Sequence, residues 1–423
     1  MEPNDTGLAS SATDGAAALP DHTGDLDQRA GLTGDWNGVR REWAETGIVV
    51  GLDLTTIYQD IVDGGIEGGS GLATNIDYRA ALDLGRMGAV PGAAISVRAQ
   101  SLFGDTVNER VGVILPVNMY SAYPIRSTPN EDIPFALTEF NWTQEVSESV
   151  GVMAGKITTL GTTNEFMGGE GRSQFMNFQL NFSAALAQVT PYSTLAAGVS
   201  WDASPVWTLS TTVMNYSDAS TSSGLDDIGE GTTWATNIDY LGSVNALPGG
   251  GGVAFYYAFD SDFARIGGVH LDPGATAVAP TESSSWALSW SGWQYITAED
   301  STAAVDPSNG RQDLQGLGLF AQFGVADRDT NPVSWSATAG VSGRGSIPGR
   351  DADTWGAGAF FNDLQELRGD STTLGGSTGG FELYYDIAFA PSVLLTLDAQ
   401  WLQGALSGVR DATILGLRLN VSL

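Results

Sequence analysis

Apolar and polar residues alternate at every second position over long stretches of the chain. In the last nine residues the apolar side chains share one face: Leu415, Leu417, Leu419, Val421 and Leu423. Segments 381–389 and 393–401 repeat the alternation immediately before this stretch. A period of two is the geometry of a β-strand. Consecutive strands of about ten residues, apolar on one side and polar on the other, are typical of a barrel wall between lipid and an aqueous lumen.

The same pattern extends back to Gly47. It predicts sixteen strands: 48–60, 73–86, 92–103, 133–146, 149–157, 192–202, 206–216, 232–245, 251–259, 284–297, 314–325, 333–343, 354–364, 380–390, 392–402 and 413–423. An even number of strands lets both ends of the chain lie on the same side of the membrane, and short turns should alternate with longer outer loops. Connection 298–313 is long for a turn, and 326–332 is short for an outer loop. We therefore predict an all-β fold, with a transmembrane, sixteen-stranded antiparallel β-barrel over 48–423.

The chain before the predicted barrel is acidic at first. Residues 1–31 are small, acidic and poor in large apolar groups, which predicts a disordered leader. No basic region and apolar core follow Met1, so we expect this sequence to carry no signal peptide and to be that of a mature or recombinant chain.

Segment 32–47 predicts a short periplasmic amphipathic helix. Asp35 can cap its start, and Gly47 is a natural stop. Three apolar residues share one helical face: Trp36, Val39 and Trp43. We interpret this face as a packing surface.

The connection 158–191 is long and unusually apolar. Loops of about 30 residues are uncommon in compact proteins unless they are functional. This one carries four aromatic residues: Phe166, Phe175, Phe178 and Phe182. We predict that it folds into the barrel as a constriction loop.

Composition narrows the choice of class. Hydrophobic residues make up 42% of the 423 residues, yet no run approaches the roughly 18 uninterrupted apolar residues that a membrane helix needs. The 18 basic and 49 acidic residues give a net charge of −31, which argues against nucleic-acid binding. The acids could be solvated loops and turns, or a vestibule that attracts cations. There are no cysteines, which excludes disulfides and thiolate metal sites.

Several different short motifs follow one another along most of the chain. They lie at 32–40 (LTGDWNGVR), 47–48 (GI), 75–84 (NIDYRAALDL), 154–156 (AGK), 163–166 (TNEF), 316–321 (GLGLFA), 329–332 (DTNP) and 348–351 (PGRD). Together they resemble the carbohydrate-selective porin family, often called OprB-like. The resemblance implies a sixteen-stranded barrel in the outer membrane of a Gram-negative-type bacterium, through which sugars diffuse. The chain departs from the family pattern in its acidity and in Leu423, where such barrels often carry Phe.

Charged side chains on the predicted strands should face the lumen, because a charge facing lipid costs about 2–4 kcal/mol at mid-membrane. The candidate pore-lining residues on strands and constriction loop are Asp77, Arg79, Arg98, Glu139, Lys156, Glu165 and Arg172. A sugar pore needs donors and acceptors that match hydroxyl groups, together with aromatic faces for the sugar rings. The alternative is that arginine–carboxylate pairs neutralise one another and stiffen the inner wall.

Catalysis is not expected. Barrel hydrolases use a histidine as general base, and the two histidines here are His22, in the leader, and His270, in a predicted outer loop. One weak calcium pattern, for which a solvated turn is the preferred interpretation, consists of Asp306, Asn309 and Asp313. We expect no enzyme, no cofactor and no metal.

The leading prediction is thus an outer-membrane porin for passive diffusion of mono- or oligosaccharides and other small solutes. A general or cation-selective porin is the first alternative. A structural or adhesion barrel with acidic outer loops and a plugged lumen is the second. The expected partners are outer-membrane lipid, sugars and small solutes, with a homotrimer as a candidate assembly.

Overall fold

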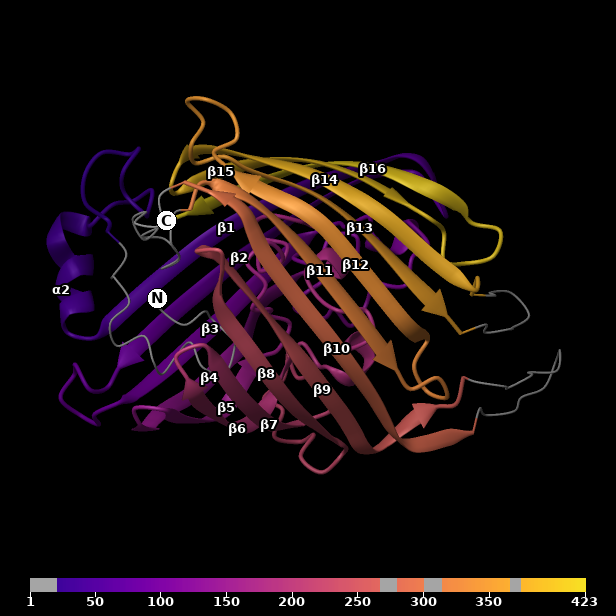
Figure 1. Cartoon of the computed structure of the whole chain (residues 1–423), viewed down its shortest axis with the longest axis horizontal. Helices are drawn as coiled ribbons and strands as arrows, with labels where there is room; N and C mark the ends of the chain where they lie inside the picture. The colour runs from indigo at the N-terminus through magenta and orange to yellow at the C-terminus, as the bar shows by residue number, and fades with distance from the viewer. Residues whose placement is uncertain (1–20, 267–279, 300–313, 366–373) are drawn as a thin grey trace.

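The computed structural model describes residues 21–266, 280–299, 314–365 and 374–423. Within these ranges, sixteen antiparallel strands form a closed barrel, in which each strand pairs with its sequence neighbours and β1 closes against β16 (Figure 1). The strands are β1 (Ile48–Gly65), β2 (Gly69–Asp83), β3 (Ala93–Gly104), β4 (Ile133–Ser147), β5 (Val150–Thr158), β6 (Ser193–Ser204), β7 (Trp207–Asn215), β8 (Thr232–Val244), β9 (Leu247–Ala264), β10 (Thr281–Ala298), β11 (Gly316–Ala326), β12 (Val333–Arg344), β13 (Thr354–Leu364), β14 (Ser377–Ala390), β15 (Val393–Leu402) and β16 (Arg410–Ser422). Each overlaps one predicted segment, so the predicted barrel is confirmed.

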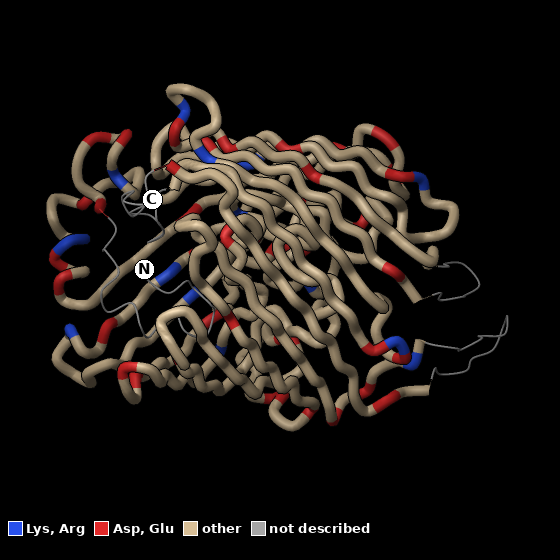
Figure 2. The backbone as a smooth tube through the Cα atoms, viewed as in Figure 1, with Lys and Arg blue, Asp and Glu red and all other residues tan. Residues whose placement is uncertain are grey.

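The alternation along each strand separates the outside of the barrel from its inside. On β16, Leu417 is 46% exposed on the outer face, whereas its neighbour Arg418 is 1% exposed and points inward. Leu417 lies opposite Leu397 of β15, so the apolar rows continue from strand to strand. Figure 2 shows most acidic and basic residues near the two ends of the barrel, which leaves the middle of the outer wall largely uncharged.

A short helix stands at one end of the barrel. A 3₁₀-helix (Trp36–Gly38) leads into α2 (Val39–Glu45), and the Asp35 carboxylate accepts a hydrogen bond from the Arg41 amide at 3.0 Å. Gly47 ends the turn with φ at 95°, where an added Cβ would lie 2.7 Å from the Asp83 carbonyl oxygen. Among the described residues, no helix is long and apolar enough to cross a membrane.

The predicted packing face of this helix needs correction. Trp36 and Trp43 are 40% and 41% exposed, and the buried residues are instead Arg40 and Ala44. The Arg40 guanidinium lies 4.2 Å from the centre of the Trp36 ring and donates to the Leu423 carbonyl oxygen at 2.6 Å. The helix is therefore attached through a buried arginine, and its indole rings face outward.

Part of the leader that we expected to be disordered also has a defined place. Residues 21–31 lie beside the end of the barrel, where Ala30 is buried and its amide donates to the Asp21 carbonyl at 2.8 Å. The Leu32 amide donates to the Ser422 carbonyl at 2.8 Å, which attaches the segment to the last strand. Residues 1–20 lie outside the described ranges.

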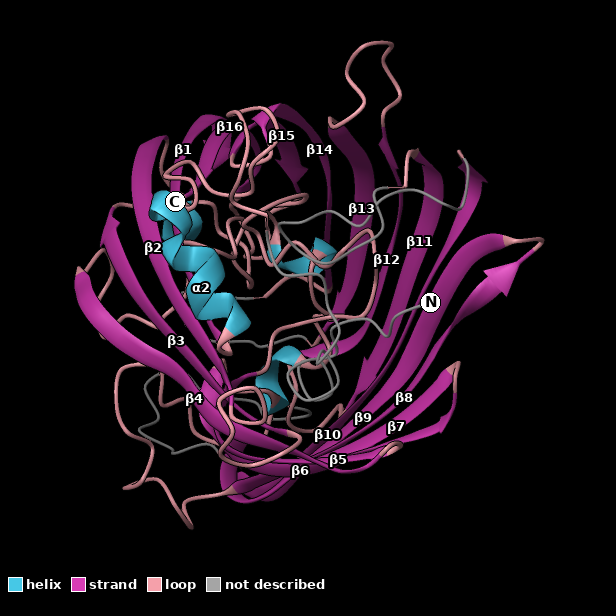
Figure 3. Ribbon diagram, turned by 90° about the vertical axis from the view of Figure 1, so that its left-hand side faces the viewer, coloured by secondary structure: helices cyan, strands magenta, loops and turns pink. Residues whose placement is uncertain are grey.

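Two long connections fold into the barrel (Figure 3). The predicted constriction loop, 159–192 in the structure, buries all four of its phenylalanines: Phe166, Phe175, Phe178 and Phe182. The connection 105–132 also folds inward, which we did not predict, and its Val117 is fully buried. Backbone hydrogen bonds join the two connections, from Met119 to Met176 at 2.8 Å and from Phe178 to Pro116 at 3.0 Å. The lumen is therefore narrowed by two loops that support each other.

Candidate functional site

The inner face of β1, β2 and β3 carries two rows of like charge. Asp53 lies opposite Asp77, and two residues further along β2, Arg79 lies opposite Arg98. Diagonal neighbours on adjacent strands are within reach of long side chains. Arg98 therefore binds Asp77, with Nη2 to Oδ2 at 2.7 Å, and Arg79 forms an ion pair with Asp53. The two like-charge rows offset each other through these diagonal contacts.

The constriction loop completes this arrangement with two further charges. Glu170 Oε2 lies 3.3 Å from Arg98 Nη1, and Arg172 Nη1 lies 3.4 Å from Asp53 Oδ1. We call the six residues the constriction cluster: Asp53, Asp77, Arg79, Arg98, Glu170 and Arg172. It contains three cations and three anions, so its formal charge is zero.

The members of the cluster differ in how far they reach into the lumen. The side chains of Arg79 and Glu170 are each 41% exposed, and that of Arg172 is 29% exposed. Asp53 and Asp77 are buried behind them. The buried acids hold the arginines in place, and the exposed groups offer two hydrogen-bond donors and one acceptor to a solute.

Two tyrosines from the infolded loops support the cluster. Tyr120 donates to Asp77 Oδ2 at 3.2 Å, and Tyr192 donates to the Gln100 side-chain oxygen. Burial, together with the Asp77 carboxylate, raises the pKa of Tyr120 well above its usual range, so the phenol stays protonated and donates. A cavity of about 20 Å³ beside Arg98 has room for one water molecule and not for a sugar ring. Solutes must therefore contact the exposed side of the cluster.

Two buried residues of β14 and β16, on the other side of β1 from β2, bind the backbone of the constriction loop. Arg418 Nη1 donates to the Gly171 carbonyl at 2.8 Å, and its Nη2 donates to the Gln174 carbonyl at 2.7 Å. The Glu382 carboxylate accepts the backbone amides of 176–177 at 2.5 and 2.9 Å. These contacts on both sides of Arg172 fix the height at which the loop crosses the lumen.

Four of the predicted pore-lining residues meet in the cluster: Asp77, Arg79, Arg98 and Arg172. Glu139 lies opposite Arg98 on the next strand and accepts a hydrogen bond from the Asn141 amide group at 2.7 Å. Asp53 and Glu170 were not among our candidates. The alternation on the first strand, in which Asp53 faces the same way as Asp77, was the available signal for Asp53.

The remaining two candidates lie apart from the cluster. The Lys156 ammonium is buried and donates to three backbone carbonyls, those of Leu137, Ala219 and Ser222, at 2.6, 2.6 and 2.7 Å. This geometry favours a structural role for Lys156, which attaches the connection 216–231 to the wall. Glu165 belongs to the constriction loop, and its backbone carbonyl accepts from Gln174 Nε2 at 2.9 Å.

No metal site is evident in the part of the chain that the structure describes, where no three His, Cys, Asp or Glu side chains are placed to share an ion. The weak calcium pattern at Asp306, Asn309 and Asp313, and the residue His270, lie outside the described ranges.

A closed sixteen-stranded barrel with an apolar exterior, infolded loops and charges around its lumen defines a porin. The family model described as "Carbohydrate-selective porin, OprB family" matches residues 71–423, and the chain belongs to this family. The predicted resemblance is thus confirmed. The protein is a carbohydrate-selective porin of the outer membrane of Gram-negative bacteria, not an enzyme. Most of the connections at the α2 end of the barrel are short, as periplasmic turns usually are. The periplasmic position of the helix stays a prediction.

Solved structures agree with the fold. The high-pH structure of Pseudomonas putida OprB superposes with a TM-score of 0.78 at 18% identity, covering 94% of this chain and 99% of that chain. The low-pH structure of the same protein gives a TM-score of 0.56 at 16% identity with the same coverage. Pseudomonas aeruginosa OccK5 (OpdH) gives 0.50 at 10% identity, covering 89% of this chain and 98% of that chain. A comparison with curated proteins gives no match.

Proposed function

We propose that sugars diffuse passively through the lumen past the constriction cluster, where Arg79, Arg172 and Glu170 bind their hydroxyl groups. The observation that carries this proposal is the pairing of every cluster charge with an opposite one, which leaves strong donors and an acceptor with no net charge. A neutral polyol gains hydrogen bonds at such a site, whereas a lone ion is both attracted and repelled. Passage also requires that binding be weak enough for release.

Aromatic stacking contributes less to this proposal than the sequence suggested. Tyr120 and Tyr192, the tyrosines nearest the cluster, are buried, and their hydroxyl groups are engaged with Asp77 and Gln100. The phenylalanines of the constriction loop are buried too. The exposed polar groups therefore carry the recognition of the sugar in our proposal.

A preference for cations over anions is the second candidate property. The net charge of −31 favours it, because an acidic field around the mouths raises the local concentration of cations. In this view the cations gather at the ends of the barrel, and the neutral cluster does not select them. The predicted homotrimer stays a prediction, which the mass of the native particle in detergent tests.

Planar-bilayer recording tests the sugar site. Glucose and maltooligosaccharides are added to single channels of the parent, Arg172→Gln and Glu170→Gln. Loss of a hydrogen bond to a charged group costs about 1.5–3 kcal/mol, so the block constant should weaken roughly 10- to 100-fold, at 1.4 kcal/mol per tenfold. Reversal potentials in a salt gradient measure the cation preference separately.

The matched control is Arg410→Gln. Arg410 lies at the outer end of β16, where it pairs with Asp63 at 2.6 Å and both side chains are largely exposed. The substitution removes one positive charge far from the constriction, and sugar block should stay at the parental value. Equal block in Arg172→Gln, Glu170→Gln and the parent would show that sugars bind elsewhere.

A further inference from the structure

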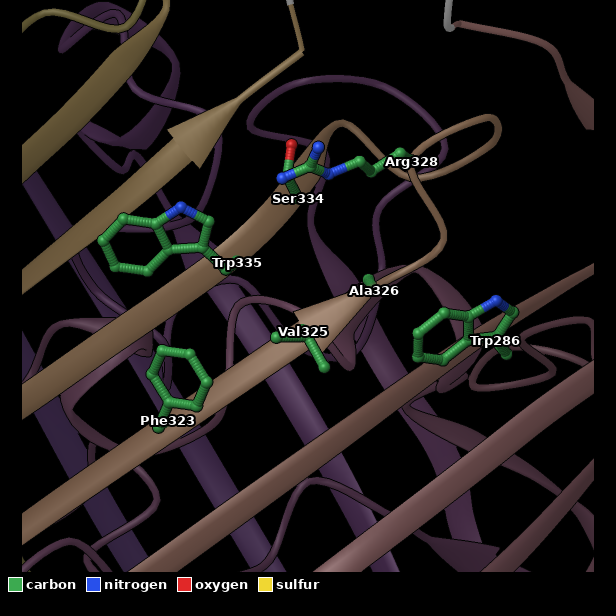
Figure 4. A pocket seen from close by; sticks show the side chains of 7 residues that line it. All are labelled: Trp286, Phe323, Val325, Ala326, Arg328, Ser334 and Trp335. Carbon is green, nitrogen blue, oxygen red and sulfur yellow. The ribbon is translucent and has the colours of Figure 1, made fainter.

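A shallow groove of about 690 Å³ lies on the outer wall, at the outward-facing ends of β10, β11 and β12 (Figure 4). The residues that matter here are Trp286, Phe323, Val325, Arg328, Ser334 and Trp335. The connection between β11 and β12, 327–332, has only six residues, whereas the long connections 105–132 and 159–192 fold into the lumen. Trp286 and Phe323 are 37% and 45% exposed, whereas their strand neighbours Ser285 and Gln322 are buried, so the groove lies on the outer, lipid-facing side of the wall.

The strand register explains why the wall is hollowed here. Val325 of β11 lies opposite Trp335 of β12, and the Asp327 amide donates to the Trp286 carbonyl of β10 at 2.9 Å. A small side chain thus stands between two indole rings, and Phe323 lies next along the same face of β11. Figure 4 shows the two rings on either side of this gap. The gap is an apolar furrow with the width of one β-strand, which suits an extended acyl chain.

One cation stands at the outer end of the furrow. Arg328 is exposed, and Figure 4 shows its side chain directed back toward Ser334. Two other arginines of this rim are paired with carboxylates, Arg265 with Glu282 at 3.6 Å and Arg410 with Asp63 at 2.6 Å. Arg328 forms no such pair with any described residue.

Asp327 and Asp329, the neighbours of Arg328 in the sequence, form no ion pair with it. The Asp327 carboxylate instead accepts the Asp329 amide at 3.0 Å and shapes the turn. In a chain with 49 acidic residues, an arginine that pairs with no described carboxylate, above an apolar furrow, has charge complementarity to an anionic amphiphile. Guanidinium binds phosphate through parallel hydrogen bonds, and tryptophans favour the level of the lipid headgroups.

We propose that this groove retains one phosphorylated glycolipid of the outer leaflet. Its phosphate binds the exposed Arg328, and one of its acyl chains lies between Trp286 and Trp335 over Val325. The outer leaflet is the source because the groove lies at the end of the barrel opposite α2, the helix that we predict to be periplasmic. The proposal concerns the outer wall and does not depend on where sugars bind in the lumen.

Native mass spectrometry of the whole protein in detergent tests the proposal. The probe is a monophosphorylated, multiply acylated glucosamine disaccharide, compared with the same lipid lacking its phosphate and with phosphatidylglycerol. We expect one molecule of the phosphorylated glycolipid to stay bound at low probe concentration. The phosphate-free lipid and Arg328→Gln should each weaken this binding at least tenfold, and Arg410→Gln, which removes a paired arginine of the same rim, should not.

A second variant changes the furrow and keeps the charge. Val325→Trp fills the space between the two indoles and should also lower binding at least tenfold. Single-channel conductance of Arg328→Gln and Val325→Trp should equal that of the parent, because neither side chain faces the lumen, and this serves as the control for folding. Parental binding by Arg328→Gln, or equal binding of the phosphate-free lipid, would overturn the phosphate site. Preference for phosphatidylglycerol would overturn the assignment to an outer-leaflet glycolipid.

Discussion

Arg418 offers the sharpest test of how the lumen is narrowed. Its side chain is 1% exposed and holds the constriction loop to β16 by hydrogen bonds to the carbonyls of Gly171 and Gln174. It also contacts Asp386 at 3.3 Å and donates to the Thr396 hydroxyl at 3.0 Å. Arg418→Met keeps much of the apolar volume of the side chain and removes all of these interactions.

The expected effect on the loop is large. Each hydrogen bond from a charged donor contributes about 1.5–3 kcal/mol, so the two bonds to the loop backbone account for about 3–6 kcal/mol of local stability. At 1.4 kcal/mol per tenfold, segment 171–174 should leave the wall about 10²–10⁴ times more often. Loss of one partner of the buried pair with Asp386 also costs the whole barrel about 3–5 kcal/mol.

Recordings of single open channels measure this motion. Glu170 and Arg172 move with the loop, so Arg418→Met should show larger current fluctuations and weaker block by sugar than the parent. Arg418→Lys keeps the charge beside Asp386 but cannot span both carbonyls, and an intermediate result is expected. Parental noise and parental block in a correctly folded Arg418→Met channel would refute the reasoning. The loop would then be held by Glu382 and the buried phenylalanines alone.

Two further substitutions test contacts outside the cluster. Lys156→Met leaves three backbone carbonyls without their ammonium donor, so the connection 216–231 should become sensitive to limited proteolysis while sugar block stays parental. At the turn before β13, burial opposes ionisation of Asp353, but hydrogen bonds from Arg350, Tyr385 and the Ala388 amide outweigh it and lower the pKa of Asp353. A lowered pKa stabilises the fold above the ordinary aspartate value of about 3.9, and this stabilisation is lost as the pH falls through the lowered value. Asp353→Asn should therefore reduce the temperature of the heat-induced gel shift at pH 7, with a difference that shrinks progressively below about pH 4; a difference independent of pH would contradict this account.

The barrel could be predicted from the sequence because its signal is local. A membrane forces every second residue outward over each strand, so the face of Asp77 or Arg98 follows from its immediate neighbours. The alternation shows which charged side chains share the inner face, but it does not give the register of one strand against the next. The diagonal pairing of Asp77 with Arg98 depends on that register and therefore required the structure.

The contents of the lumen depend on contacts between distant segments. Connection 105–132 has no regular period, and it folds inward because its backbone pairs with 176–178 of the other loop. The position of Lys156 depends in the same way on carbonyls more than 60 residues further along the chain. The outward face of α2 was misread because helical spacing identifies an apolar face and does not identify what covers it. Arg40 provides the attachment instead.

The acidity of the chain and the neutrality of the constriction cluster describe two separable steps of permeation. The acids gather toward the ends of the barrel (Figure 2), where mobile ions screen them over a Debye length of about 8 Å at physiological salt. Cluster charges are paired at contact distance and partly buried, as in the 2.7 Å contact between Arg98 and Asp77, and salt screens such pairs far less. Raising the ionic strength should therefore reduce the preference for cations in reversal-potential measurements and leave the sugar block constant nearly unchanged. If both fell together, the same exposed charges would govern ion entry and sugar binding, and the division between mouth and constriction would be wrong.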